Sequence, residues 1–343
     1  MRKSKFLSIL LALCLTLSLL PTAALADGGT NYVKASYELN GVTQTFEGTT
    51  LREVNDKMRT YWEVNDANGC GYNVDKLPAD GTGTLTWTVY GTVQQGDYKN
   101  SGALILPALS GGYIYHDGTY QWDNINVVAG TEDATIVSYS DFDVAHTYIS
   151  CGKTATTFTG ITISGGIYAM PAAGTIAFND CTFTGQLRVP NGAGTMKVNH
   201  CNFTAQTAAQ DSNGYVFHYQ GGGKLEFTNN NVANGYKRGL NIDNASLTAT
   251  VSGNTLGTVA DAGRSAIQIT NATKLEIAGN NITLNGGNAF TLHEALAANS
   301  DIDITGNTIT GTGYLFYDES KNAIDLTYSG NTVDETINTT EGI

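Results

Sequence analysis

The tetrad Gly-Asn-x-aliphatic occurs four times, as Gly253-Asn254-Thr255-Leu256, Gly279-Asn280-Asn281-Ile282, Gly306-Asn307-Thr308-Ile309 and Gly330-Asn331-Thr332-Val333. Mostly apolar residues stand five and three positions before each Asn, for example Leu275 and Ile277 before Asn280. This alternation predicts a strand with one buried face. The Gly-Asn pair that follows predicts a bend at which a left-handed backbone conformation is tolerated.

The same frame continues upstream, where other residues take the place of the Asn. The recurring position, which we call the ladder, is occupied by Ile161, Cys181, Cys201, Asn230, Asn254, Asn280, Asn307 and Asn331, at spacings of 20 to 29 residues. A unit of this length cannot bury its own apolar face, so the units must stack as the coils of a solenoid. Neighbouring coils would lie ~4.8 Å apart, which lets Asn amides hydrogen-bond from coil to coil. A β-propeller or a β-sandwich is disfavoured, because a sandwich shows turn signals about every 8–12 residues.

The ladder and its tetrads resemble the pectin-lyase-like right-handed parallel β-helix family over roughly residues 85–343. The resemblance implies an all-β fold with a short N-terminal capping helix. Thr50 and Glu53 have the spacing of a capping box, and Leu51, Val54 and Met58 follow at helical intervals. A helix at this place would shield the edge of the first coil from pairing with other chains.

The N-terminus has the pattern of an export signal. Arg2, Lys3 and Lys5 precede an apolar run from Phe6 to Leu20, and Ala24-Leu25-Ala26 supplies a cleavage site. We therefore predict a signal peptide over 1–26, an N-terminal cap region over 27–84 and the β-helix over 85–343. No later stretch is long and apolar enough to cross a membrane. The expected product is a monomer, secreted or at the cell surface, without membrane insertion after cleavage.

The chain is acidic. Once the predicted signal is removed, 15 Lys and Arg stand against 31 Asp and Glu, a formal charge of −16. Such a chain repels nucleic acid and anionic membrane surfaces, so neither is an expected partner.

Four cysteines remain after the predicted cleavage: Cys70, Cys151, Cys181 and Cys201. Their spacing lacks a CxxC pair, so a structural zinc site has no support. Cys181 and Cys201 are one coil apart in the ladder, within disulfide range, and both a bridge and a reduced pair are open. We predict no cofactor. Glu276 and Asp303 occupy neighbouring coils and offer a weak Ca²⁺ signal, against which stands a simple solvated face.

A second strand falls between successive ladder positions, and its outward face is where ligands are expected. The alternation buries Leu240 and Ile242, and likewise Ile267 and Ile269. Aromatic, amide and charged side chains on the other face suit sugar rings and hydroxyls. The candidate ligand-binding residues are Phe217, Tyr219, Lys237, Asn241, Asp243, Arg264, Gln268, His293, Phe316 and Asp318. A second aromatic group, Tyr113, Tyr115, Tyr120 and Trp122, could bind sugar or pack under turns.

The resemblance also defines what a catalytic member would carry. Hydrolases of the family present clustered Asp residues and a Gly-His-Gly turn, and this chain has neither an Asp-Asp pair nor that turn. Asp243 and Asp318 would be ~14 Å apart, beyond the ~6.5–9.5 Å of inverting carboxylate pairs. We therefore predict a non-catalytic protein that binds an extracellular glycan or mediates surface attachment. The alternative is a polysaccharide lyase or glycoside hydrolase acting on acidic polysaccharide, with a divergent site near Lys237, Asp243, Arg264 and His293.

Overall fold

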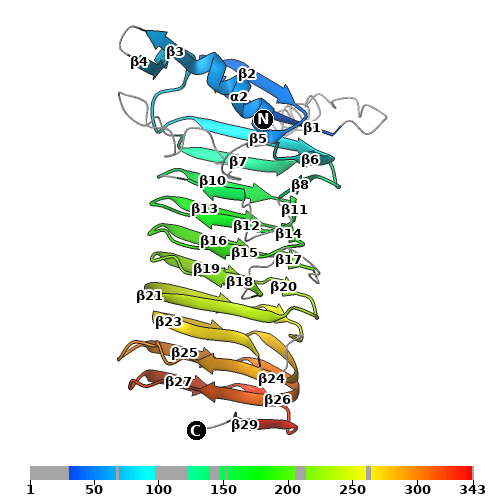
Figure 1. Cartoon of the computed structure of the whole chain (residues 1–343), viewed down its shortest axis with the longest axis vertical. Helices are drawn as coiled ribbons and strands as arrows, with labels where there is room; N and C mark the ends of the chain where they lie inside the picture. Colours follow the sequence, from blue (N-terminus) through cyan, green and yellow to red (C-terminus); the bar gives the residue numbers. More distant parts are fainter. Residues whose placement is uncertain are drawn as a thin grey trace, which may run out of the picture. The chain divides into compact units, whose positions relative to one another are not determined.

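The computed structural model describes residues 31–66, 69–96, 122–138, 147–151, 153–204, 214–259 and 264–341. The part from Tyr32 onward is a right-handed parallel β-helix, which confirms the predicted all-β solenoid (Figure 1). Its coils stack in three columns of hydrogen-bonded parallel strands, here called the first, second and third stacks. The predicted signal peptide and Tyr113, Tyr115 and Tyr120 lie outside the described residues, and so does the side chain of Cys70.

The first stack carries the apolar pairs that precede the ladder. Its separate strands are β5 (Thr84–Tyr90), β7 (Asn124–Ala129), β10 (Ala155–Thr159), β13 (Thr175–Asn179), β16 (Thr195–Asn199), β19 (Lys224–Thr228), β25 (Asp301–Thr305) and β27 (Asp325–Ser329). The second stack follows the ladder and holds β6 (Thr92–Gln94), β8 (Thr135–Val137), β11 (Thr162–Ser164), β14 (Thr182–Phe183), β17 (Asn202–Phe203), β20 (Asn231–Val232), β22 (Thr255–Leu256) and β28 (Thr332–Val333).

The third stack is the second strand foreseen from the sequence. It contains β9 (Thr147–Ser150), β12 (Ile167–Met170), β15 (Leu187–Val189), β18 (Tyr215–Tyr219) and β29 (Ile337–Glu341). Four long strands bend and serve two stacks each: β21 (Arg238–Ser252), β23 (Ser265–Ala278), β24 (Asn281–Leu292) and β26 (Thr308–Asp318). One column of buried aliphatic and aromatic side chains fills the space between the stacks.

The Asn ladder forms as predicted. The backbone N–H of each of Cys201, Asn230, Asn254, Asn280 and Asn307 donates to the side-chain Oδ1 one coil further on, at 2.8 to 3.0 Å. The Asn side chains from Asn230 to Asn307 are at most 2% exposed. The residue before each ladder position has a φ of 53° to 68°, whether it is Gly, Asp180, His200 or Asn229. This left-handed residue makes the bend, which explains why Gly recurs there.

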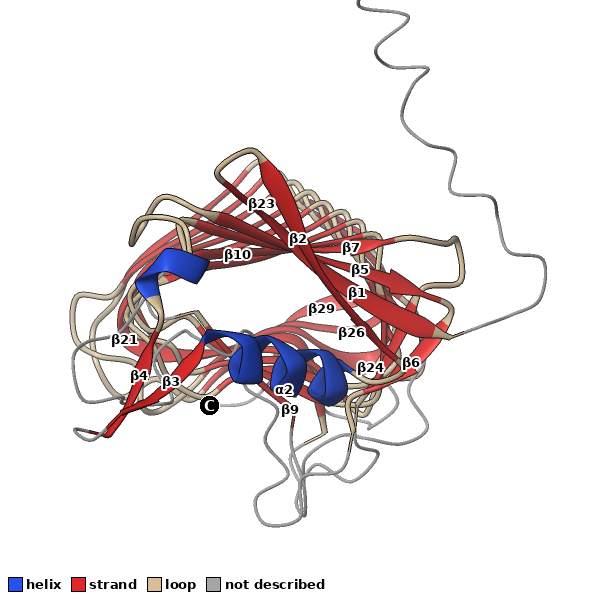
Figure 2. Cartoon of the chain, turned by 90° about the horizontal axis from the view of Figure 1, so that it is seen from above, coloured by secondary structure: helices blue, strands red, loops and turns tan. Residues whose placement is uncertain are grey.

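The N-terminal end is closed by a cap. It consists of the antiparallel strands β1 (Tyr32–Leu39) and β2 (Val42–Gly48), the helix α2 (Leu51–Trp62), the hairpin β3 (Glu63–Asp66) with β4 (Gly69–Tyr72), and the short 3₁₀ helix η1 (Val74–Lys76). Seen along the solenoid, α2 lies across the end of the coils (Figure 2). Leu51, Val54 and Met58 are fully buried against the first coil, which confirms the predicted capping helix.

The predicted capping box of Thr50 and Glu53 forms with its return bond shifted by one residue, to Thr49. The N–H of Glu53 donates to Thr50 Oγ1 at 3.1 Å, and Glu53 Oε2 accepts the N–H of Thr49 at 2.8 Å. The Lys57 ammonium, 2.8 Å from Glu53, and the Thr49 donors lower the pKa of the Glu53 carboxyl from 4.5 to about 2. Since the depressed pKa belongs to the folded state, the ionised carboxylate stabilises the cap fully above about pH 4.5, and this contribution disappears as the pH falls towards 2.

We therefore expect Glu53→Gln to lower the Tm by about 2 °C at pH 7 and to leave it unchanged near pH 2. Thermal unfolding followed by circular dichroism at both pH values measures the difference, with the exposed Glu335→Gln as a control. An equal loss of Tm at pH 7 and pH 2 would show that the charge of Glu53 is not what stabilises the helix.

Candidate functional site

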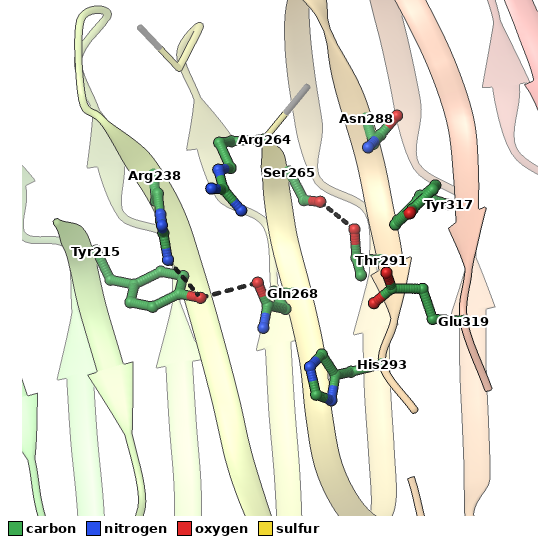
Figure 3. A pocket seen from close by; sticks show the side chains of 10 residues that line it. All are labelled: Tyr215, Arg238, Arg264, Ser265, Gln268, Asn288, Thr291, His293, Tyr317 and Glu319. Carbon is green, nitrogen blue, oxygen red and sulfur yellow. Dashed lines mark hydrogen bonds between the residues drawn. The ribbon is translucent and has the colours of Figure 1, made fainter. Parts of the chain in front are cut away.

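The outward face of the third stack carries a polar cavity of about 570 Å³. Side chains from β18, β21, β23, β24 and β26, with the turns beside them, form its walls (Figure 3). The lining residues are Tyr215, Arg238, Arg264, Ser265, Gln268, Asn288, Thr291, His293, Tyr317 and Glu319. The volume lies within the range usual for small-molecule sites, about 300–1,000 Å³.

One wall is organised around Tyr215. Its hydroxyl donates to Gln268 Oε1 at 2.8 Å, and Arg238 Nη1 lies 3.5 Å from the same hydroxyl oxygen. The Arg238 guanidinium also stands over the Tyr215 ring, 5.3 Å from its centroid. These contacts hold Arg238 in place at the edge of the cavity without neutralising its charge.

The opposite part of the cavity has buried polar atoms. The hydroxyls of Ser265 and Thr291 hydrogen-bond to each other between neighbouring coils. Asn288 is 1% exposed, and among the described residues its Oδ1 has no hydrogen-bond partner. A buried amide oxygen left without a donor costs roughly 1–3 kcal/mol. In Figure 3 this oxygen faces away from the other lining residues, and the amide nitrogen of Asn288 faces toward them.

Two side chains at the rim add further polar groups. Ala295 N–H donates to His293 Nδ1 at 3.2 Å, so the neutral imidazole carries its proton on Nε2 and acts as a donor there. Glu319 is exposed and contributes an acceptor on β26's side of the cavity, away from the two arginines (Figure 3).

Asp243 lies beside the cavity and is engaged elsewhere. Its Oδ2 is 3.8 Å from His218 Nε2 and accepts a hydrogen bond from Gln220 Nε2 at 3.2 Å. The His218 ring, and to a smaller extent the Gln220 amide, lower the pKa of this half-buried carboxyl against the opposing effect of burial. Asp243 is therefore ionised at neutral pH.

Of the residues predicted from the sequence, Gln268, Arg264 and His293 line the cavity. Asn241 is 4% exposed and accepts a hydrogen bond from Thr270 Oγ1 at 2.8 Å, next to Gln268 in the same row. Lys237 is exposed and is not among the lining residues, whereas the adjacent Arg238 is. Asp318 forms local hydrogen bonds: its Oδ1 accepts one from the backbone N–H and one from the hydroxyl of Ser320.

The predicted outward orientation of three aromatic residues is wrong. Phe217 and Tyr219 are 0% exposed, and Phe316 packs partly buried against the core. The register aligns Phe217 with Leu240, Ile267, Phe290 and Phe316, all on the inner face. The outward row is His218, Asn241, Gln268, Thr291 and Tyr317. A shift of one residue exchanges the two faces of a strand, which is the error made at both ends of this row.

Several lining residues are not among the candidates predicted from the sequence: Tyr215, Arg238, Ser265, Asn288, Tyr317 and Glu319. Arg238 could have been found as the second basic residue of the Lys237-Arg238 pair, two positions before the buried Leu240. Trp122, named as a sugar-binding aromatic or a packing residue, is 2% exposed and packs in the cap core against Tyr37 and Trp62.

Metal ligands do not gather in the described part of the chain. Glu276 and Asp303 are register partners as expected, but nowhere among these residues do three His, Cys, Asp or Glu side chains lie close enough to hold a metal ion. Cys181 and Cys201 are buried thiols, and the Cys181–Cys201 bridge is not formed in this structure. The hydrogen bond that the Cys201 thiol donates to Cys181, together with burial, raises the pKa of Cys201.

No helix among the described residues is long and apolar enough to cross a membrane. No curated protein and no solved structure matches the chain. Residues 117–342, which are 226 of the 343, match the family described as "Periplasmic copper-binding protein (NosD)". That periplasmic description agrees with the predicted placement outside the cytoplasm. The chain belongs to the NosD family.

Proposed function

We propose that this β-helix binds an extracellular glycan in the cavity on its third stack and does not alter it chemically. The observation that carries the proposal is the cavity itself, where hydroxyl, amide, guanidinium and imidazole groups from successive coils converge. Coils ~4.8 Å apart present these groups at intervals close to the length of one sugar ring. A saccharide offers hydroxyls that both donate and accept, which suits a mixed wall of this kind.

The same geometry supports binding more than catalysis. A general base needs an unprotonated atom that faces the substrate, and His293 Nδ1 already accepts the N–H of Ala295. A general acid needs a raised pKa, whereas the pKa of Asp243 is lowered by His218. Cleavage of an acidic polysaccharide by a lyase or hydrolase is therefore the second candidate, favoured only by the presence of Arg264 and His293 in the cavity.

Copper binding, which the family description names, does not fit the described residues. Copper prefers imidazole nitrogens and sulfur atoms brought together in one site. Here His200 Nδ1 is bonded to the Asn199 amide, His218 is paired with Asp243, and His293 Nδ1 is bonded to Ala295. The proposed function therefore makes no use of copper.

A screen of neutral and acidic oligosaccharides against the purified protein tests the proposal. We expect retention of at least one glycan without new reducing ends or unsaturated products. Gln268→Ala should raise the Kd of that glycan roughly tenfold, because the substitution removes an amide that lines the cavity. Thr255→Ala, an exposed change on the second stack, should leave the Kd unchanged. Cleavage products, or equal effects of the two substitutions, would contradict the proposal.

A further inference from the structure

We infer that the sugar unit held in the cavity carries a negative charge, and that Arg238 and Arg264 bind its anionic group. This inference rests on the proposed glycan-binding function and specifies the class of sugar. The anionic group is a carboxylate, a sulfate or a phosphate, all of which match the fork of a guanidinium.

Arg238 and Arg264 bring two positive charges into one cavity of an acidic chain. Acidic residues outnumber basic ones, 31 to 18, and many basic side chains are used in ion pairs, such as Lys197 with Glu226 and Lys274 with Asp301. Neither Arg238 nor Arg264 has a carboxylate partner within the part of the chain that the structure describes. Two uncompensated guanidiniums in one cavity of an acidic protein create a local site for an anion.

The position of Arg238 is fixed before any ligand arrives. The Tyr215 ring lies under its guanidinium, and the Tyr215 hydroxyl is 3.5 Å from Nη1. Tyr215 is in turn held by Gln268. A side chain ordered in this way loses less conformational freedom on binding, which favours a specific contact over a diffuse attraction.

The other side of the cavity offers groups for sugar hydroxyls. Thr291, Tyr317 and Glu319 line it and supply hydroxyl and carboxylate oxygens. An inorganic anion has no hydroxyl to donate to these oxygens, whereas a sugar does. The two arginines on one side and these acceptors on the other therefore define a ligand with an anionic group and free hydroxyls.

Calorimetric titration with matched oligosaccharides of equal length tests the inference. The probes are oligogalacturonate, its carboxyl-reduced galactose form, and sulfated and phosphorylated galactose oligosaccharides. We expect at least one anionic probe to bind roughly ten- to a hundredfold more tightly than the neutral form. The three anionic probes distinguish the source of the charge.

The variants assign that preference to the arginines. Arg238→Gln with Arg264→Gln should bring the anionic probe within about threefold of the neutral one, while Gln268→Ala should weaken the binding of both probes roughly tenfold. Lys153→Gln, which removes an exposed positive charge outside the cavity, should change neither affinity, and equal Tm values would show that the variants are folded. Equal binding of neutral and anionic probes, unaffected by the arginines, would overturn the inference and leave the proposed function standing. Failure of every probe to bind would overturn both.

Discussion

Asn280→Ala is expected to destabilise the protein by about 3 kcal/mol or more, the effect of several buried hydrogen-bond partners lost at once. Asn280 Oδ1 accepts the backbone N–H of Asn254 at 3.0 Å and its side-chain Nδ2 at 2.9 Å. Asn280 Nδ2 donates to the carbonyl of Val251 and to Asn307 Oδ1, both at 2.9 Å. Truncation leaves these groups unsatisfied in a position that is 0% exposed, where water cannot replace the amide.

The measurement is the urea midpoint of unfolding, read from the circular dichroism of the purified protein. The neighbouring Asn281→Ala is the matched control: Asn281 is exposed, and its loss should change stability by no more than about 0.5 kcal/mol. Similar shifts for the two variants would mean that the ladder amides do not stabilise the stack.

Phe217→Ala should cost about 3–5 kcal/mol, the usual range for a phenylalanine removed from a well-packed core. The ring is 0% exposed and lies 4.9 Å from the ring of Phe227, centroid to centroid. Urea unfolding tests this value against the exposed Val42→Ala, for which a change below about 0.5 kcal/mol is expected. A Phe217→Ala protein that kept full stability but lost glycan affinity would place this ring on the outer face.

The fold could be predicted from the sequence because one position carries the same physical demand in every coil. Asn280 and its equivalents must satisfy backbone groups within a bend, and the residue before them must accept a positive φ. Few side chains meet either demand, so the repeat is visible despite spacings that vary from 20 to 29 residues. Helix α2 could also be predicted, because its capping residue and the spacing of its apolar residues are local features of the sequence.

The orientation of the third stack could not be predicted as reliably. Tyr215-Val216-Phe217-His218-Tyr219 has no clear alternation, because every side chain in it can be buried. The number of residues from this strand to the next ladder residue also varies. It is 13 after Phe217 and 17 after Phe290, which occupies the same column three coils further on. The ladder therefore does not fix the phase of the third stack, and a slip of one residue went undetected.

The cavity was predicted only in part for a related reason. Gln268 lies in β23 and His293 directly follows β24, so their outward direction followed from the buried Ile267, Ile269 and Leu292. Arg238 is the first residue of β21, and Asn288 follows the irregularity at 285–287 inside β24; hydrophobic periodicity does not set the path of the chain at either place.

The most direct test of the account is a crystal structure of the protein with its tightest-binding anionic oligosaccharide. We predict electron density for the sugar on the outer face of the third stack, with its anionic group between Arg238 and Arg264 and a hydroxyl within hydrogen-bonding distance of Gln268 or Thr291. A sugar bound on another stack, or one whose anionic group points away from both arginines, would contradict it.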